Sequence, residues 1–262
     1  MSHRIDSRWH SEHIAIISFQ DPPRQNQLCW AAIDELAGTI VQCRERGARI
    51  VILASSLAGH WYEHAWLGDL ENRLADRPMT GSGMGWFSAP LELSQKSLLS
   101  IAAISGDCSG GGAELGWACD FRVAERQARF SQPEIKIQLT PGIGGCSRLA
   151  RLVGTAFAKQ LVMTGQPVTA ERLYQFGAVN ELVEEGQALA AAIALAESLL
   201  ENSWPALLSL KSTLAEGLEL PLAQALEREQ EAFQSVLLGA EGRAGLAATQ
   251  ARFDGGESIA EV

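Results

Sequence analysis

Three short apolar runs constrain the fold of this chain most strongly. Residues 14–19, 50–54 and 99–104 are short and rich in β-branched side chains, which predicts buried strands. Between the first two runs, residues 28–46 place apolar side chains close to a 3.6-residue period, which predicts a helix. Strand, helix and strand at this spacing favour right-handed βαβ units, so we expect an α/β domain.

The rest of the chain divides into an irregular region and a helical end. Residues 59–96 form a long uneven stretch, which is typical of either a functional insertion or a disordered segment. A composition shift near residues 202–205 predicts a boundary between an α/β core, residues 1–202, and a helical region, residues 203–262. Further helices are predicted at 147–152, 156–163, 170–176, 188–200, 207–218, 220–238 and 242–252.

Charge and composition narrow the class of protein. The chain has 21 Lys and Arg against 31 Asp and Glu, a formal net charge of −10, which argues against nucleic acid or an anionic membrane as the main partner. Its longest apolar run, residues 188–196, is about half of the roughly 20 residues that a membrane span requires. The N-terminal residues lack the apolar stretch of a signal peptide. We therefore expect a soluble cytoplasmic protein.

The cysteines and histidines give no metal signature in the sequence. The five cysteines include no CxxC pair, and the five histidines include no HExxH or other ligand spacing. We therefore expect reduced thiols and no metal site.

A glycine-rich turn is the densest chemical signal. Residues 109–114 read Ser-Gly-Gly-Gly-Ala-Glu, after a predicted strand and before an apolar helix start. Glycines allow the backbone to approach a ligand closely, and the first N–H groups of a helix suit an oxyanion. The sequence forms neither the GxxxxGK[ST] phosphate loop nor the GxGxxG dinucleotide pattern. A purely structural turn is the alternative.

Two isolated carboxylates flank this turn. Glu114 ends it, and Glu134 follows a proline some twenty residues later. A first-turn acid stabilised by the helix dipole is the alternative for Glu114, and a capping or loop acid for Glu134. Two acids beside an oxyanion site would suit water activation and proton delivery.

The order of several short motifs resembles the enoyl-CoA hydratase/isomerase (crotonase) superfamily, and the resemblance can be followed from about residue 14 to 253. The matching pieces are RQNQL (24–28), HAWL (64–67), SGGGAE (109–114), FSQPE (130–134), PGIGG (141–145), LVMTG (161–165) and FGAVN (176–180).

This resemblance implies a fold and an assembly. The family has a ββα spiral core followed by a helical trimerisation region, which corresponds here to residues 1–202 and 203–262. It binds acyl-CoA, so coenzyme A is part of the substrate and no separate cofactor is implied. A homotrimer or dimer of trimers is expected, with the apolar side chains of Leu220, Leu222, Leu226 and Phe233 buried between subunits.

The resemblance also implies roles for particular residues. The backbone N–H groups of Ala65 and Gly111 would hold the thioester oxygen. Glu114 would orient and deprotonate a water that attacks Cβ, while Glu134 would protonate Cα, which favours hydration. The alternatives are other chemistry on an acyl-CoA (double-bond isomerisation, C–C hydrolysis or decarboxylation) and a non-catalytic subunit with the same fold.

Three positions depart from the family pattern, one of them Gln27, where the family has alanine between asparagine and leucine. The oxyanion loop of the family usually reads Ala-Gly-Ala-Asp, whereas this chain has His64 and Trp66 in place of the glycine and the aspartate. Because positive φ is costly for a residue other than glycine, His64 raises the question whether the loop keeps its turn. His64 as an extra acid or base is a further possibility. We expect substrate contacts from Arg24, His64, Trp66 and Gly110.

Overall fold

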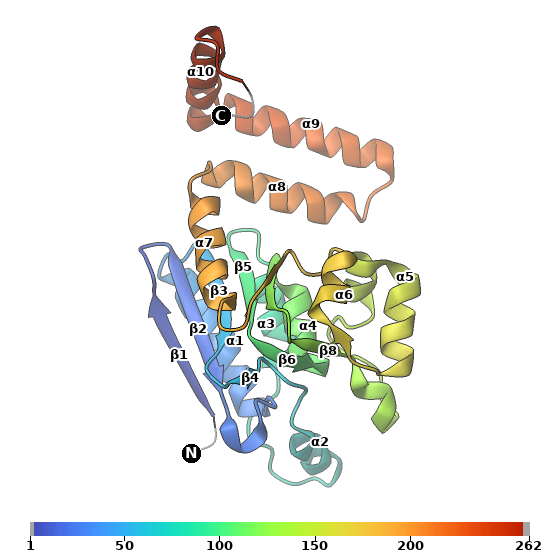
Figure 1. Ribbon diagram of the computed structural model, residues 1–262. Helices are drawn as coiled ribbons and strands as arrows, with labels where there is room; N and C mark the ends of the chain where they lie inside the picture. The colour runs from blue at the N-terminus through green and yellow to red at the C-terminus, as the bar shows by residue number, and fades with distance from the viewer. Residues whose placement is uncertain (1–2, 259–262) are drawn as a thin grey trace. The chain divides into compact units, whose positions relative to one another are not determined.

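The computed structural model describes residues 3–258, and its central element is a six-stranded sheet in the order β1-β2-β3-β5-β7-β10 (Figure 1). β1 pairs antiparallel with β2, and all other neighbouring strands are parallel. The predicted strands are confirmed as β2, β3 and β5. The strands are β1 (Arg4–Trp9), β2 (Ile14–Gln20), β3 (Ile50–Ser55), β5 (Leu99–Ile104), β7 (Phe121–Glu125) and β10 (Glu181–Val183).

The middle of this sheet is buried on both faces. Ile16, Ile52 and Ile101 are neighbours across three parallel strands, and none of them has exposed surface. Burial on both faces explains why these strands appear in the sequence as continuous apolar runs. The sequence analysis did not predict β1, because most of its side chains are exposed and charged residues interrupt its apolar ones.

A second, smaller sheet has the order β4-β6-β8-β9. Three consecutive pairs of strands are divided between the two sheets: the first strand of each pair lies in the large sheet and the second in the small one. These pairs are β3/β4, β5/β6 and β7/β8. Helices follow β4 and β6, so the chain winds through repeated ββα units. This confirms the expected α/β class and ββα spiral core. The bounds are β4 (Gly59–His60), β6 (Gly106–Ser109), β8 (Arg129–Ser131) and β9 (Val168–Thr169).

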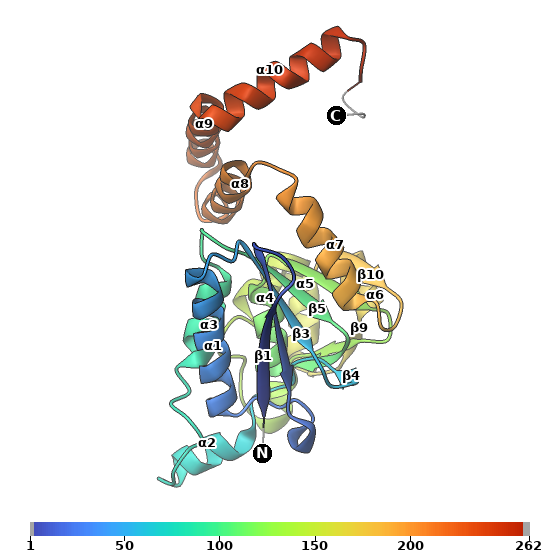
Figure 2. The same cartoon turned by 90° about the vertical axis from the view of Figure 1, so that its left-hand side faces the viewer.

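Two helices lie side by side on one face of the large sheet, α1 (Trp30–Glu45) and α3 (Gly85–Leu93) (Figure 2). α1 is the helix predicted for residues 28–46, and its buried side chains recur at helical spacing. The irregular stretch 59–96 contains α3 and a second helix, α2 (Leu67–Leu74). This stretch is therefore an ordered insertion.

The helices predicted at 170–176 and 188–200 are confirmed as α6 and α7. The segments at 147–152 and 156–163 are confirmed as the two parts of α5, which breaks at Gly154 with φ of 75° and ψ of 158°. The other bounds are η1 (Pro22–Arg24), α4 (Gly110–Ala118), η2 (Pro133–Ile137), α5 (Ser147–Thr164), α6 (Ala170–Gln175) and α7 (Ala188–Leu200).

The chain divides into two compact units, Met1–Ala196 and Glu197–Val262. The boundary expected after residue 202 falls within the second unit and stays a prediction. In this unit α8 packs against α9, where Arg228 Nε donates to Glu216 Oε2 at 2.7 Å. No helix among residues 3–258 is long and apolar enough to cross a membrane. The helices are α8 (Trp204–Gly217), α9 (Leu222–Leu238) and α10 (Ala240–Asp254).

Candidate active site

The three glycines at the start of α4 are required by close packing. Gly110 has a φ of +48°, in the region that favours glycine. A Cβ on Gly112 would lie 2.0 Å from the carbonyl oxygen of Tyr62. The glycines thus let the first turn of α4 lie directly against the segment that carries residues 62–65. The structural and the functional interpretations of this turn are therefore compatible.

Ala65 and Gly111, one from each of these two segments, line one cavity. Leu28 forms a parallel bridge with Ala65: its N–H donates to His64 O at 3.1 Å, and its carbonyl accepts from Trp66 N at 2.9 Å. In a parallel bridge the N–H of the central residue points away from the partner, so the Ala65 N–H faces away from Leu28. Gly111 is the second residue of α4, and its N–H has no partner within the helix. Ala65 and Gly111 line the same pocket.

The loop that carries His64 and Ala65 is formed without backbone strain at His64. It is not one of the residues with positive φ. Its N–H donates to Ser109 Oγ at 3.1 Å, and Ser109 Oγ donates to Glu63 Oε2 at 2.5 Å. Glu63 Oε1 in turn lies 2.9 Å from His60 Nδ1. This chain of polar contacts fixes the peptide that precedes Ala65.

Glu114 is a buried acid held by the glycine-rich segment 141–145. Its side chain is on α4, only 3% of the residue is exposed, and it lines the pocket. Oε1 accepts the N–H of Ile143 at 2.8 Å and the N–H of Gly145 at 2.6 Å. Two backbone donors therefore fix the position of this carboxylate.

Glu134 lies in the first turn of η2 and lines the same pocket. Burial raises the pKa of its carboxyl to about 7, since the charged form loses contact with water. Its own backbone hydrogen bond opposes this rise in pKa, and the negative charge of Glu114 adds to it. Near neutral pH Glu134 is therefore about half protonated.

Gln132 positions Glu134, a role that the sequence analysis missed. Gln132 has no exposed surface. With its amide oriented to satisfy both neighbours, its nitrogen donates to Glu134 Oε1 at 3.1 Å and its oxygen accepts from Trp117 Nε1 at 3.1 Å. Glutamine occurs in the quoted FSQPE motif, but its contacts depend on the distant Trp117, which no local pattern indicates.

These groups share a cavity of about 850 Å³, a size typical of small-molecule sites. His64 also lines it, beside the two N–H donors and the two acids. A mainly apolar part of the lining, the apolar wall, comes from α1, α2, α3 and the loop between the last two. Its apolar members are Trp30, Leu67, Leu70, Met79, Met84, Trp86 and Phe87.

Two aspartates hold this apolar wall in place. Asp69 has no exposed surface, and it accepts the N–H of Trp30 and the N–H of Thr80, both at 2.7 Å. Asp34 accepts the N–H of Ser82 at 2.6 Å and the N–H of Gly85 at 2.8 Å. The loop from α2 to α3 is therefore anchored to α1 at two points.

Three of the expected substrate contacts lie outside the pocket lining. Arg24 Nη1 donates to Asp21 Oδ2 at 2.9 Å, and its guanidinium carbon lies 4.7 Å above the ring of Trp66. Neither Arg24 nor Trp66 belongs to the described residues that line the cavity, and Gly110 does not either. Their contacts with substrate stay predictions.

The chain is similar to known proteins along nearly its whole length. Residues 10–254 match the family described as enoyl-CoA hydratase/isomerase. The short-chain-enoyl-CoA hydratase of Clostridium acetobutylicum is 40% identical over 143 residues, which cover 55% of this chain and 54% of that protein. The match therefore spans about half the length of that relative. The 2,3-dehydroadipyl-CoA hydratase of Escherichia coli is 30% identical over 261 residues, covering 97% and 94% of the two chains.

A solved structure shows the same arrangement of the chain. The crystal structure of an enoyl-CoA hydratase from Bacillus anthracis superposes with a TM-score of 0.83 at 28% identity. The superposition covers 95% of this chain and 96% of the other.

Proposed function

The chain belongs to the enoyl-CoA hydratase/isomerase family, and on that premise we propose that it adds water to an α,β-unsaturated acyl-CoA thioester, giving a 3-hydroxyacyl-CoA, or catalyses the reverse reaction. One observation carries this proposal: Glu114 and Glu134 line the same cavity as Ala65 and Gly111. Hydration needs both a group that activates water and a group that delivers a proton, and two acids beside an oxyanion site supply both.

The first step is polarisation of the substrate. The thioester oxygen accepts hydrogen bonds from the N–H groups of Ala65 and Gly111, and these bonds strengthen as negative charge develops on that oxygen. By analogy with acyl transfer, each donor contributes about 2.7–4 kcal/mol to the transition state. The contacts of His64 with Ser109 keep the first donor in position.

Addition of water then uses the two acids in opposite roles. Glu114 takes a proton from the water, whose oxygen attacks Cβ while the π electrons move onto the thioester oxygen. Glu134 gives its proton to Cα as the carbonyl reforms. The raised pKa of Glu134 supports this assignment, because the acid must hold its proton near neutral pH.

The same proposal covers cofactor, partners and compartment. The two acids and the two N–H donors supply every group that the reaction needs, so we propose no cofactor beyond the coenzyme A of the substrate. The free thiols of Cys29, Cys43, Cys108, Cys119 and Cys146 support a reducing compartment such as the cytoplasm. We also propose a homotrimer or dimer of trimers, supported by the exposed leucines of α9.

The proposal is tested with crotonyl-CoA as substrate, by following the loss of absorbance of the conjugated thioester. We expect turnover by the wild type, and a loss of about 10²–10⁴-fold in each of Glu114→Gln and Glu134→Gln. Glu171→Gln, on the exposed part of α6, is the matched control. Full turnover in both variants, or no turnover by the wild type, contradicts the proposal.

The same variants separate hydration from isomerisation. Isomerisation moves a proton between two carbons and needs one acid, so it is expected to survive the loss of Glu114 better than the loss of Glu134. An isomerase is therefore indicated if Glu114→Gln moves a double bond at the wild-type rate.

A further inference from the structure

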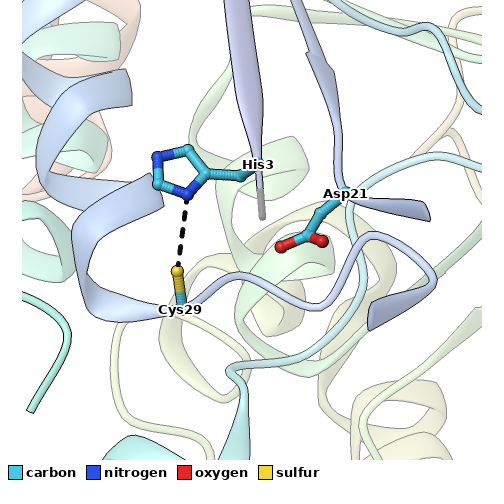
Figure 3. Close-up of side chains that lie close together, drawn as sticks. All are labelled: His3, Asp21 and Cys29. Carbon is cyan, nitrogen blue, oxygen red and sulfur yellow. Dashed lines mark hydrogen bonds between the residues drawn. The ribbon is translucent and has the colours of Figure 1, made fainter. Parts of the chain in front are cut away.

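Three side chains of different chemistry lie close together, and none of them is among the described residues that line the cavity (Figure 3). They are His3, which directly precedes β1, Asp21 at the end of β2, and Cys29 at the N-cap of α1. His3 Nδ1 lies 3.8 Å from Cys29 Sγ, and one donor atom from each of the three side chains lies within 4.8 Å of the others. We propose that these three residues bind one divalent transition-metal ion, with zinc as the best fit.

The distances suit a tetrahedral zinc site. With Zn–S of about 2.3 Å and Zn–N of about 2.0–2.1 Å, the sulfur and nitrogen ligands of a tetrahedral ion are about 3.6 Å apart. The observed separation of Cys29 Sγ and His3 Nδ1 is 3.8 Å. Drawing the most distant pair of donors together requires a shift of about 1 Å, which side-chain rotation supplies.

Asp21 provides an independent observation that points to a cation. The residue has no exposed surface, and its Oδ1 accepts no hydrogen bond from the described residues. A buried carboxylate oxygen without a donor is costly, and such groups in native structures often mark an ion or water site. A metal ion would satisfy this oxygen while Oδ2 keeps its bond to Arg24.

The outer contacts are those of a metal site. His3 Nε2 lies 2.9 Å from Glu35 Oε2, so the carboxylate can accept a hydrogen bond from Nε2–H, which leaves Nδ1 unprotonated as the ligand atom. Arg24 Nη1 donates to Asp21 Oδ2 at 2.9 Å and orients that carboxylate. Metal-binding histidines and carboxylates are commonly held by second partners of these kinds.

The charges balance at this site when zinc is bound. The Cys29 thiol loses its proton to solvent as the Zn–S bond forms, so the thiolate and the Asp21 carboxylate together cancel the two charges of the ion. His3 remains neutral, and the charges of Arg24 and Glu35 cancel one another. A neutral assembly avoids the cost of leaving a net charge beside the buried Asp21 and Cys29.

The role that follows is structural. The ion would fasten the start of β1 to the first turn of α1 and to the turn that begins at Asp21. That turn leads to Leu28, which bridges Ala65. The sequence analysis expected no metal site because the three ligands come from separate segments, at positions 3, 21 and 29, without the close spacing of a zinc motif.

Binding is tested by titrating the purified protein with Co²⁺ and Zn²⁺. We expect one ion per chain and, with cobalt, a thiolate-to-metal charge-transfer band that zinc displaces. Cys29→Ser and His3→Gln are expected to abolish both signals. Cys43→Ser, a buried cysteine on the same helix, and His10→Gln are the controls and are expected to bind as the wild type does.

A second measurement distinguishes loss of the metal site from loss of folding, which Cys29→Ser alone does not. Added zinc is expected to raise the melting temperature of the wild type, and a chelator to reverse the rise, with no response in His3→Gln. His3 is part-exposed, so this variant keeps the fold, as circular dichroism can verify. Substoichiometric binding, or binding unchanged in His3→Gln, overturns the proposal. The outcome of either metal experiment does not test the proposed hydration, because that reaction uses the two glutamates and not this ion.

Discussion

Glu134 is the residue whose charge state the fold controls most clearly. In the proposed hydration, Glu134 gives up a proton and Glu114 gains one. The reverse reaction starts from that second state, so each direction requires one proton on the pair. Above the pKa of about 7, Glu134 loses its proton and the pair can no longer supply one. Raising the pH above about 7 is therefore expected to lower the activity in both directions.

We expect kcat/KM for hydration to fall about tenfold per pH unit above about pH 7, and the reverse reaction to follow the same curve. The measurement is a pH profile of both directions with crotonyl-CoA and its 3-hydroxy product. Profiles that stay flat above about pH 7 contradict the assignment of Glu134 as the acid. A control at each pH is the circular dichroism spectrum, which should not change.

The sequence indicated the proposed reacting groups better than the residues that position them. Glu114, Glu134, Ala65 and Gly111 belong to motifs that can be read locally, and the structure brings all four to one cavity. Glu63 and Gln132 act through contacts with residues far along the chain, so no local pattern indicated their roles.

Among the elements, α4 is the one whose position the chemistry depends on most. A Cβ on Gly112 would lie 2.0 Å from the Tyr62 carbonyl oxygen, which is backbone and cannot rotate away. Gly112→Ala is therefore expected to push the first turn of α4 from the Ala65 loop. We predict a loss of stability of about 1–3 kcal/mol, as for overpacked cores, and a loss of turnover.

Gly116→Ala is the matched control on the same helix, because its Cβ would meet only side chains, the nearest 3.4 Å away in Trp61. Alanine favours a helix interior over glycine by about 0.5–1 kcal/mol, so this variant is expected to be neutral or more stable. Urea unfolding and the hydration assay measure both effects. Equal stability of the two variants would show that α4 does not depend on this close contact.

Elements were predictable where burial imposes a regular pattern. β2, β3 and β5 are buried on both faces and appear in the sequence as continuous apolar runs, whereas α1 buries one stripe and shows a helical period. The short strands of the small sheet have no such signature, because two to four residues are too few to show a period. α2 escaped prediction because its buried residue is Asp69, so it has no buried apolar stripe. α3 buries apolar side chains but contains Pro90, and a proline inside a segment argues against a helix there.

At the scale of the whole molecule, the second unit leaves an apolar stripe exposed on α9. Leu222 is 74% exposed, Leu226 51% and Phe233 57%, and their spacings of four and seven residues place them on one helix face. Apolar side chains gathered in this way commonly mark a protein–protein interface. We therefore expect the stripe to lie between subunits.

Leu226→Glu is expected to shift the protein from a trimer or hexamer toward monomer, because a charge would be buried at the interface. Sedimentation velocity measures the change. Leu74→Glu on α2, where the leucine is 90% exposed, is the control and should leave assembly unchanged. A wild type that sediments as a stable monomer contradicts the proposed assembly.

Because Asp69 and Asp34 anchor the apolar wall of the cavity, the substrate range of such a protein can change separately from its proposed chemistry. The groups proposed for the chemistry come from α4, η2 and the Ala65 loop, whereas most of the apolar wall comes from residues 67–87, a later part of the insertion with its own supports. Met79 and Met84 can therefore be exchanged without disturbing either acid. Substitutions within residues 67–87 are expected to change substrate range in small steps while activity is kept, and a directed search for new specificity is best confined to those residues.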